Sequence, residues 1–241
     1  MSLVKRFERN TTGRDLAVGD IHGHFTRLEA ALASIGFDES RDRLFSVGDL
    51  VDRGPESHLA LDWIGNPWFH AVQGNHEDMC KRWPNGNMDA GNYAANGGGW
   101  NIANTPDVRR AFSDALGTLP VAIQVETEAG LVGIVHADCP FPTWGDFIWS
   151  LDGAPISNGM RERIVDAAMW SRERIQSEDQ TGIPDVRAVI VGHTPLKRPA
   201  VLGNVYHIDT GGWLRDGYFT FINLATLETI PAMQQKLEWT A

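Results

Sequence analysis

In the segment Leu16-Ala17-Val18-Gly19-Asp20-Ile21-His22-Gly23, a short apolar run stops abruptly at a polar cluster, and this arrangement gives the first indication of the fold. The same arrangement recurs where Leu44–Val47 stops at Gly48-Asp49 and where Phe69–Val72 leads to Gly74-Asn75-His76-Glu77. Short apolar runs bounded by glycine are typical of buried strands, although periodicity alone leaves a buried helix open. If these runs are strands, their polar residues lie at the carboxyl ends.

Two runs further along the chain repeat this ending. Leu131–Val135 stops at His136, and Ala188–Val191 stops at Gly192-His193. Three remaining runs have short connections, which suit a further sheet of mixed or antiparallel strands. These runs are Val121–Val125, Val205–Ile208 and Tyr218–Leu224.

Two segments between the early runs have helical features. Apolar residues recur at helical spacing over residues 25–35, and Gly36 provides a stop, so we predict a crossover helix. A second helix fits from Pro55, which suits a first helical turn, to Gly65. Residues 84–104 are rich in Asn and Gly and lack a sustained apolar period, which predicts a long loop containing one helical turn.

The order of these elements predicts the fold class. Strands that alternate with helices indicate an α/β (α+β) fold in which two packed mixed β-sheets, a β-sandwich, are flanked by α-helices. A chain of 241 residues is long enough to bury one sizeable core, and no low-complexity linker divides it. We therefore predict a single domain over residues 1–241.

Composition restricts the setting and the partners. A net charge of −10 argues against a nucleic-acid partner, since a duplex binder needs a basic face to displace counterions. The apolar runs are far shorter than the roughly 20 residues that cross a bilayer, so we expect no membrane association. No signal-peptide pattern opens the sequence, and we expect a cytoplasmic protein in which Cys80 and Cys139 are reduced thiols.

The residues at the predicted strand ends offer oxygen and nitrogen donors that suit divalent metals. They are Asp20, His22, Asp49, Asn75, His136 and His193. An isolated Asp or His at a strand end is more often a cap or a turn residue. Here, however, five polar clusters follow five apolar runs, and this conjunction favours a metal site. With no thiolate in the set, manganese, iron or zinc in an open site is favoured over a closed structural zinc.

Three of the clusters resemble a family signature. The stretches Gly19–Gly23, Gly48-Asp49-Leu50-Val51-Asp52-Arg53-Gly54 and Gly74-Asn75-His76-Glu77 resemble the motifs of the phosphoprotein phosphatase family of metallophosphoesterases. Four further segments extend the likeness to about residues 15–225. They are His136-Ala137-Asp138, Trp170-Ser171-Arg172-Glu173-Arg174-Ile175, Gly192-His193-Thr194-Pro195 and Ile208-Asp209-Thr210-Gly211. Within the family, the chain is similar to the small bacterial and bacteriophage lambda type serine/threonine protein phosphatases.

The resemblance implies a calcineurin-like metallophosphoesterase architecture with two divalent metal ions at one end of the β-sandwich. Asp20 and His22 would bind one ion, and Asp49 would bridge it to the second. The remaining ligands of the second ion would be Asn75, His136 and His193. We expect manganese in both positions, with iron and zinc as the alternatives.

The resemblance also implies roles for residues outside the ligand set. His76 would be the general acid, Asp52 would orient it, and Arg53 would clamp the phosphate. Arg172 resembles the second clamp. Other arginines lie close to it in sequence, namely Arg161 and Arg174, and either is an alternative.

The chemistry of phosphate ester hydrolysis makes these roles reasonable. Two cations about 3.5–4 Å apart lower the pKa of a bridging water and neutralise charge on the phosphate. Attack by the resulting metal-bridging hydroxide expels an alkoxide, which is a poor leaving group unless an imidazole protonates it. A guanidinium group matches phosphate oxygens in geometry better than an ammonium group does.

We therefore predict a metal-dependent serine/threonine protein phosphatase that acts on phosphorylated proteins or peptides, with phosphotyrosine as a further substrate class. The alternative within enzymes is a symmetrical diadenosine tetraphosphate hydrolase, whose metal motifs are shared. Asp52 and Glu77 favour the protein phosphatase, because the resemblance around them is closer there. A non-catalytic phosphate-binding scaffold is the alternative from another class, and the loss of a ligand or of His76 would indicate it. None is lost here.

Overall fold

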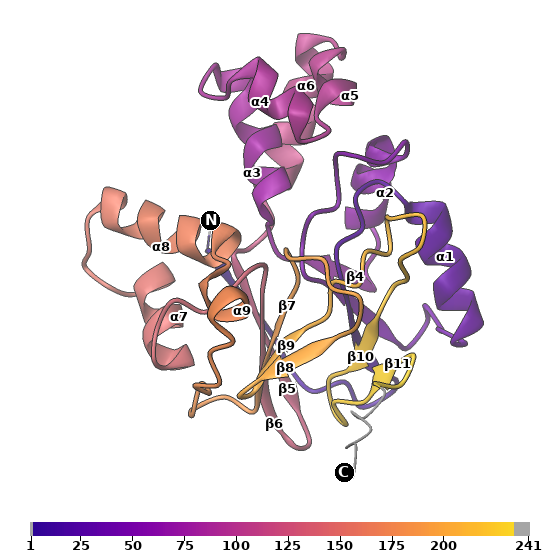
Figure 1. Cartoon of the computed structure of the whole chain (residues 1–241), viewed down its shortest axis with the longest axis vertical. Helices are drawn as coiled ribbons and strands as arrows, with labels where there is room; N and C mark the ends of the chain where they lie inside the picture. Colours follow the sequence, from indigo (N-terminus) through magenta and orange to yellow (C-terminus); the bar gives the residue numbers. More distant parts are fainter. Residues whose placement is uncertain (1, 234–241) are drawn as a thin grey trace, which may run out of the picture.

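The computed structural model describes residues 2–233, and two mixed β-sheets packed against each other form its centre (Figure 1). Helices flank both sheets, so the predicted fold class is confirmed. The prediction of a single domain over residues 1–241 includes residues 1 and 234–241, which lie outside the described part. It stays a prediction.

The larger sheet has six strands in the order β1-β5-β6-β7-β9-β8. Their bounds are Val4–Phe7 (β1), Ala122–Thr127 (β5), Gly130–Val135 (β6), Ala188–Val191 (β7), Val205–His207 (β9) and Ala200–Leu202 (β8). Strands β6, β7 and β9 run parallel, whereas β5 and β8 pair antiparallel with their neighbours β6 and β9. The carboxyl ends of β6 and β7 therefore lie at the same edge.

The smaller sheet has five strands in the order β11-β10-β2-β3-β4. Their bounds are Thr229–Ile230 (β11), Phe221–Asn223 (β10), Asp15–Val18 (β2), Arg43–Ser46 (β3) and Phe69–Ala71 (β4). Strands β2, β3 and β4 are parallel, and β10 pairs antiparallel with β2. Their carboxyl ends also share one edge, as the strand-end clusters require.

Alternate residues of a strand face opposite sides of its sheet, and the core is divided accordingly. Ala17 and Phe45 pack between the two sheets together with Ile134 and Ile190 of the larger sheet. Leu16, next to Ala17, faces the helices on the outer side of the smaller sheet. Both faces are thus buried, which explains why these strands read as continuous apolar runs.

Helices cover the outer faces of both sheets (Figure 1). The smaller sheet is covered by α1 (Phe25–Ser34), by a short 3₁₀ turn (Ser57–Leu59) with α2 (Ala60–Ile64), and by a helical lobe. This lobe, residues 75–116, contains α3 (Asn75–Arg82), a 3₁₀ turn (Trp83–Asn85), α4 (Ala90–Ala95), α5 (Gly99–Ile102) and α6 (Pro106–Leu116). The larger sheet is covered by α7 (Trp144–Asp152) and α8 (Asn158–Trp170), with α9 (Glu173–Ser177) following.

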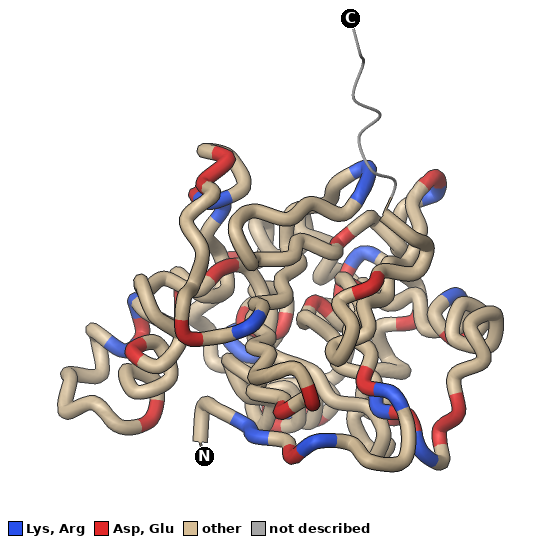
Figure 2. The backbone as a smooth tube through the Cα atoms, turned by 90° about the horizontal axis from the view of Figure 1, so that it is seen from below, with Lys and Arg blue, Asp and Glu red and all other residues tan. Residues whose placement is uncertain are grey.

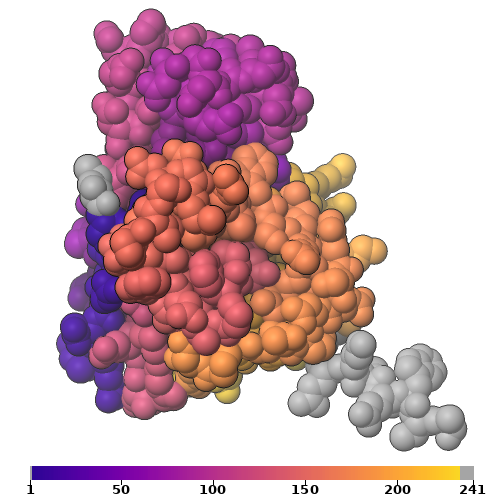
Figure 3. Space-filling model, turned by 90° about the vertical axis from the view of Figure 1, so that its left-hand side faces the viewer, coloured from indigo at the N-terminus to yellow at the C-terminus, as the bar shows by residue number. Residues whose placement is uncertain are grey.

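The helical lobe projects beyond the sheets in Figures 1 and 3. It corrects the prediction of a long loop with one helical turn over residues 84–104, because two helices, α4 and α5, lie within that segment. The Asp89 side chain accepts a hydrogen bond from the Asn92 backbone N–H at 2.8 Å and so caps α4. Helices of six and four residues are too short to produce an apolar period, which is why the sequence pattern missed them.

Two further predictions need correction. The helix expected from Pro55 starts only at Ser57, as a 3₁₀ turn, while the helix over residues 25–35 is confirmed as α1. The three later runs do not form a sheet of their own. Val121–Val125 and Val205–Ile208 supply β5 and β9 to the larger sheet, and Tyr218–Leu224 supplies β10 to the smaller one.

The surface and the cysteines agree with the composition. Lys and Arg are interspersed with Asp and Glu along the backbone (Figure 2). Within residues 2–233, no helix has both the length and the apolar character needed to cross a membrane. Cys80 and Cys139 are buried and free, as expected for reduced thiols.

Candidate active site

The strand-end residues of both sheets converge on one site. Asp20 and His22 follow β2, Asp49 follows β3, and Asn75 begins α3 just after β4. His136 and His193 follow β6 and β7 of the other sheet. All six predicted ligands are buried, with exposures of 5% or less. Two groups of donor atoms, each within 4.8 Å, share Asp49: one with His22 and His76, the other with His136 and His193.

Backbone hydrogen bonds hold the strand-end loops together. The N–H groups of Ile21 and His22 donate to the Asp49 carbonyl at 3.1 and 2.7 Å. The Gly192 N–H donates to the His136 carbonyl at 2.8 Å. Gly192 and Gly74 must lack a side chain, because a Cβ would overlap Oδ1 of Asp20 and of Asp49 respectively. The glycines of the motifs thus permit close approach of the carboxylates.

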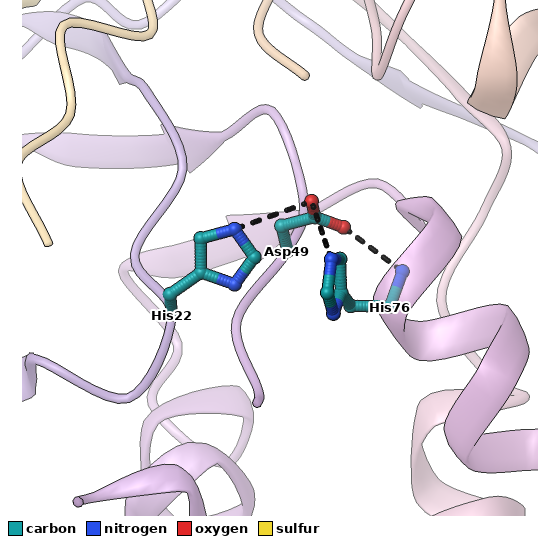
Figure 4. Close-up of side chains that lie close together, drawn as sticks. All are labelled: His22, Asp49 and His76. Atoms are coloured by element: carbon teal, nitrogen blue, oxygen red, sulfur yellow. Dashed lines mark hydrogen bonds and ion pairs between the residues drawn. The ribbon is translucent and has the colours of Figure 1, made fainter. Parts of the chain in front are cut away.

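Two imidazoles are oriented by backbone carbonyls. Nδ1 of His22 lies 3.0 Å from the Val51 carbonyl, and Nδ1 of His136 lies 2.7 Å from the Val47 carbonyl. Each Nδ1 therefore carries the proton, and each Nε2 presents its lone pair to the site. Nε2 of His22 lies 3.5 Å, and Nε2 of His136 3.4 Å, from Oδ2 of Asp49. Asp49 thus lies between the two groups of donor atoms. Figure 4 shows it between His22 and His76.

Three acceptor atoms in and beside the second donor group, that of Asp49, His136 and His193, form a tight triangle. Oδ1 of Asn75 lies 2.9 Å from Nε2 of His136 and 2.8 Å from Nδ1 of His193, and the two nitrogens are 3.2 Å apart. Two ligands about 2.1 Å from one cation and at right angles lie about 3 Å apart, so the spacing fits a shared metal ion. A divalent cation satisfies all three acceptors at once, whereas one proton cannot.

The carboxylates are placed to receive a cation as well. Oδ1 of Asp20 accepts the His193 backbone N–H at 3.1 Å, and Oδ1 of Asp49 accepts the His76 backbone N–H at 3.0 Å. Oδ2 of Asp20 is buried without a hydrogen-bond partner in the described structure, as is Oδ2 of neighbouring Asp209. A buried carboxylate oxygen without a partner is costly, and a bound cation would remove that cost. The residues present therefore fit a metal site.

The pKa shifts show that this site attracts positive charge. Burial and the charges of Asp209 and Asp49 raise the pKa of Asp20 well above its ordinary value. Burial acts to raise the pKa of Asp49 too, but the neighbouring imidazoles of His136 and His76 hold it well below its ordinary value. Burial acts to lower the pKa of His136, and the Asp49 carboxylate more than offsets this, so that the pKa is raised.

The other two imidazoles are held neutral, as metal ligands must be. Burial, together with the neighbouring His76, lowers the pKa of His22 well below its ordinary value. Burial and the nearby His136 lower the pKa of His193 to about 3. Both rings therefore keep a lone pair at neutral pH.

His76 and Asp52 form a buried pair beside the donor cluster. Nδ1 of His76 lies 2.9 Å from Oδ2 of Asp52, and neither side chain is exposed. Nε2 of His76 faces the site, 3.9 Å from Oδ2 of Asp49 and 3.1 Å from the Arg53 guanidinium. The carboxylate fixes the tautomer and orients the ring, an arrangement that suits proton transfer at Nε2.

Arg53 lies at the exposed rim of the site. Its guanidinium donates to Nε2 of His22 at 2.9 Å as well as to His76, and it stacks 4.4 Å from the ring centroid of Trp213. The edge of Trp213 also packs on His22, with centroids 4.8 Å apart. The guanidinium thus opens directly onto the donor atoms, where a phosphate oxygen would meet it.

Arg172 is exposed just before α9, and its charge contributes to the lowered pKa of His193. The two alternative arginines are engaged elsewhere. Arg174 is buried and pairs with Asp138 at 2.8 Å, while Arg161 donates to the carbonyls of Ser150 and Ala154 at 2.6 and 3.0 Å. Of the three, only Arg172 remains available for phosphate.

Unusual backbone conformations mark the same residues. Seven non-glycine residues of the described chain have positive φ, and five of them belong to this site. They are His22, Asp49, Asp52, Arg53 and His193, with φ between 45° and 70°. Such conformations cost energy in L-residues and persist where the surrounding structure enforces them, commonly at functional sites.

Comparisons with known proteins agree with this geometry. The calcineurin-like phosphoesterase family matches residues 14–197. The chain belongs to this family. It is 33% identical over 213 residues to "Serine/threonine-protein phosphatase 1" of Salmonella typhimurium, covering 87% of this chain and 91% of that protein. It is also 47% identical over 62 residues to "Bis(5'-nucleosyl)-tetraphosphatase, symmetrical" of Shewanella baltica, covering 25% of this chain and 23% of that protein.

Solved structures show the same fold. A protein serine/threonine phosphatase from Saccharomyces cerevisiae has a TM-score of 0.58 at 16% identity, covering 92% of this chain and 77% of the other. This calcineurin-like phosphoesterase is therefore a metallophosphoesterase with candidate metal ligands in the expected place.

In this phosphoesterase, four residues that the sequence analysis did not predict as site residues lie at the site. Asp209 is buried beside Asp20, and burial raises its pKa to about 6. Trp213 has no motif around it, whereas Asp209 stands in a segment that resembles the family. Trp100 and Tyr93, from the helical lobe, contact Asp52. No periodic signal marks these aromatics, since their contacts are made across the fold.

Proposed function

We propose that the chain is a metal-dependent serine/threonine protein phosphatase that hydrolyses phosphomonoesters with two divalent metal ions, manganese in preference to iron or zinc. The main support for this proposal is the buried His76–Asp52 pair. Nε2 of His76 faces the donor cluster and lies next to Arg53. A binding site for phosphate alone has no need of an oriented proton donor.

The ligand assignment rests on the donor geometry. Asp20 and His22 would hold one ion, and Asp49, with imidazoles 3.5 and 3.4 Å away on its two sides, would bridge it to the other. The other ligands of the second ion would be Asn75, His136 and His193. Two ions bound there would supply hydroxide from water at neutral pH and neutralise charge on the phosphate.

The remaining roles belong to side chains of the chain itself. Nε2 of His76 would donate a proton to the leaving alkoxide, while Asp52 stabilises the protonated ring. Arg53 and Arg172, which are both exposed, would bind the non-bridging oxygens of the phosphate. Their position near the buried imidazoles of His22 and His193 supports this assignment.

Phosphorylated proteins or peptides are the proposed substrates. The relatives named as serine/threonine-protein phosphatases match 80 to 87% of this chain, whereas those named as symmetrical tetraphosphatases match 25% of it. The higher identity within the shorter match, 47% in one case, favours diadenosine tetraphosphate hydrolysis as the second candidate.

One experiment separates these functions. The purified protein, loaded with Mn²⁺, is assayed in parallel on a phosphoserine peptide and on diadenosine tetraphosphate, and kcat/KM is compared. We expect the peptide to be preferred. Preference for the dinucleotide would support the second candidate, and a lack of turnover on either substrate, with metal bound, would indicate a phosphate-binding scaffold.

A further inference from the structure

The second oxygen of Asp52 is held by the helical lobe. Oδ2 of Asp52 contacts His76, whereas Oδ1 accepts a hydrogen bond from the indole Nε1–H of Trp100 at 2.8 Å. The Tyr93 hydroxyl lies farther from the same oxygen, at 3.4 Å. Trp100 belongs to α5, so the lobe reaches back to the catalytic pair.

Backbone contacts reinforce this connection. The Arg53 N–H donates to the Gly97 carbonyl at 3.3 Å, and a Cβ on Gly97 would overlap the Arg53 backbone. Gly97 itself has a φ of 93°, which favours glycine. The turn between α4 and α5 therefore packs directly on Arg53, the residue after Asp52. Asp52 and Arg53 have positive φ values of 70° and 67°, which the surrounding structure must enforce.

We propose that Trp100 is a positioning residue for the general acid, acting through Asp52. This inference rests on the proposed phosphatase function. Asp52 is completely buried, so removal of the indole donor leaves Oδ1 with only the longer, 3.4 Å contact to the Tyr93 hydroxyl. Without that donor the carboxylate can rotate, and the hydrogen bond that orients His76 loses its fixed geometry.

The lobe also offers a matched control. Trp83 packs on Tyr93 with ring centroids 5.8 Å apart, and its indole nitrogen is buried without a hydrogen-bond partner in the described structure. Trp83→Phe therefore makes the same chemical change as Trp100→Phe but leaves Asp52 untouched. In Trp100→Phe the new ring retains the packing that Trp100 makes against Phe112, at 4.9 Å.

The test compares two leaving groups. A phosphoserine peptide expels a basic alkoxide that needs a proton, whereas p-nitrophenyl phosphate expels an aryl oxide that does not. We expect Trp100→Phe to lower kcat on the peptide on the order of tenfold and kcat on the aryl ester about twofold or less. Trp83→Phe should leave both rates near wild type. In an Asp52→Asn background, Trp100→Phe should add little further loss, because both changes act on one unit.

A spectroscopic measurement follows the hydrogen bond itself. In the full chain with ¹⁵N-labelled tryptophan and diamagnetic Zn²⁺ in place of Mn²⁺, the indole signal absent from Trp100→Phe identifies Trp100. That signal should shift in Asp52→Asn, while the Trp83 signal stays in place.

Equal losses on the two substrates, or an indole signal unmoved by Asp52→Asn, would overturn the positioning role. A wild-type protein that hydrolyses neither phosphomonoester would instead overturn the proposed function. The indole shift would still report whether Trp100 binds Asp52, so the two failures are distinguishable.

Discussion

Oδ2 of Asp52 lies 2.9 Å from Nδ1 of His76, and no part of either side chain is exposed. With Nδ1 committed to this contact, Nε2 is the only ring nitrogen that can meet a substrate. Nε2 already has a polar neighbour in the Arg53 guanidinium, at 3.1 Å. The proposed proton donor and the proposed phosphate clamp are therefore adjacent, and the two roles can be tested separately.

The rate loss caused by replacing the proposed proton donor should depend on the leaving group. We expect His76→Asn to slow hydrolysis of a phosphoserine peptide roughly 10²–10⁴-fold, with a smaller effect on p-nitrophenyl phosphate. Asp52→Asn should give the same pattern in weaker form. Steady-state kinetics under conditions where chemistry limits both rates provide the comparison. If both substrates suffer equally while metal content is intact, His76 serves the phosphate or the metals instead.

Metal removal should abolish activity. The six proposed ligands are oxygen and nitrogen donors, so EDTA should strip the ions and Mn²⁺ should restore turnover. Asp49→Asn should lower both metal stoichiometry and rate, because one carboxylate lies between the two halves of the site. Elemental analysis alongside the assay provides the check. Full activity in protein shown to be metal-free would contradict the two-metal assignment.

The exposed arginines should affect phosphate binding and the buried one should affect stability. Arg53→Ala and Arg172→Ala should each cost about 2–4 kcal/mol of transition-state stabilisation and weaken inhibition by vanadate. Arg174→Ala leaves Asp138 buried without its partner, so it should lower the free energy of unfolding by about 3–5 kcal/mol. Denaturant titration and inhibition constants distinguish the effects. A vanadate defect confined to Arg174→Ala would place the second clamp there.

Trp213 should support the clamp through stacking. Loss of the contact with the Arg53 guanidinium in Trp213→Leu should weaken vanadate binding two- to fivefold, which corresponds to about 0.5–1 kcal/mol. Trp149, 58% exposed on α7, provides the control variant Trp149→Leu. Inhibition constants should change only for Trp213. An unchanged constant in Trp213→Leu would mean that hydrogen bonds alone hold Arg53.

The sequence predicted the strands best where their ends carry a local signal. The runs before Gly19, Gly48 and Gly192 are short, buried on both faces and cut off by glycine, and all three form strands. Strand pairing was harder to predict, because partners lie far apart in the chain. Asn223 of β10, for example, pairs with Leu16 of β2, and no local pattern records that contact.

The residues of the candidate site were likewise predicted only where a local sequence motif marks them. Residues that must approach the donor cluster closely stand in glycine-bounded motifs, and the structure brings all six predicted ligands together. Trp100 and Trp213 contribute through ring contacts and one indole N–H, which any tryptophan can offer. Trp144, by contrast, is the first residue of α7 and is buried in the core at 1% exposure. Only the folded arrangement distinguishes the tryptophans at the site from those in the core.

The donors are drawn from both halves of the sandwich. Asp49 and Asn75 follow strands of the smaller sheet, whereas His136 and His193 follow strands of the larger one. The thickness of the layer between the sheets therefore acts as a spacer for the donor set. Phe45 and Ile134 lie in that layer without being ligands themselves. A close-packed interior transmits even a one-methylene change in volume, so a substitution in this layer would change the separation between the two groups of donors while every donor stays unaltered.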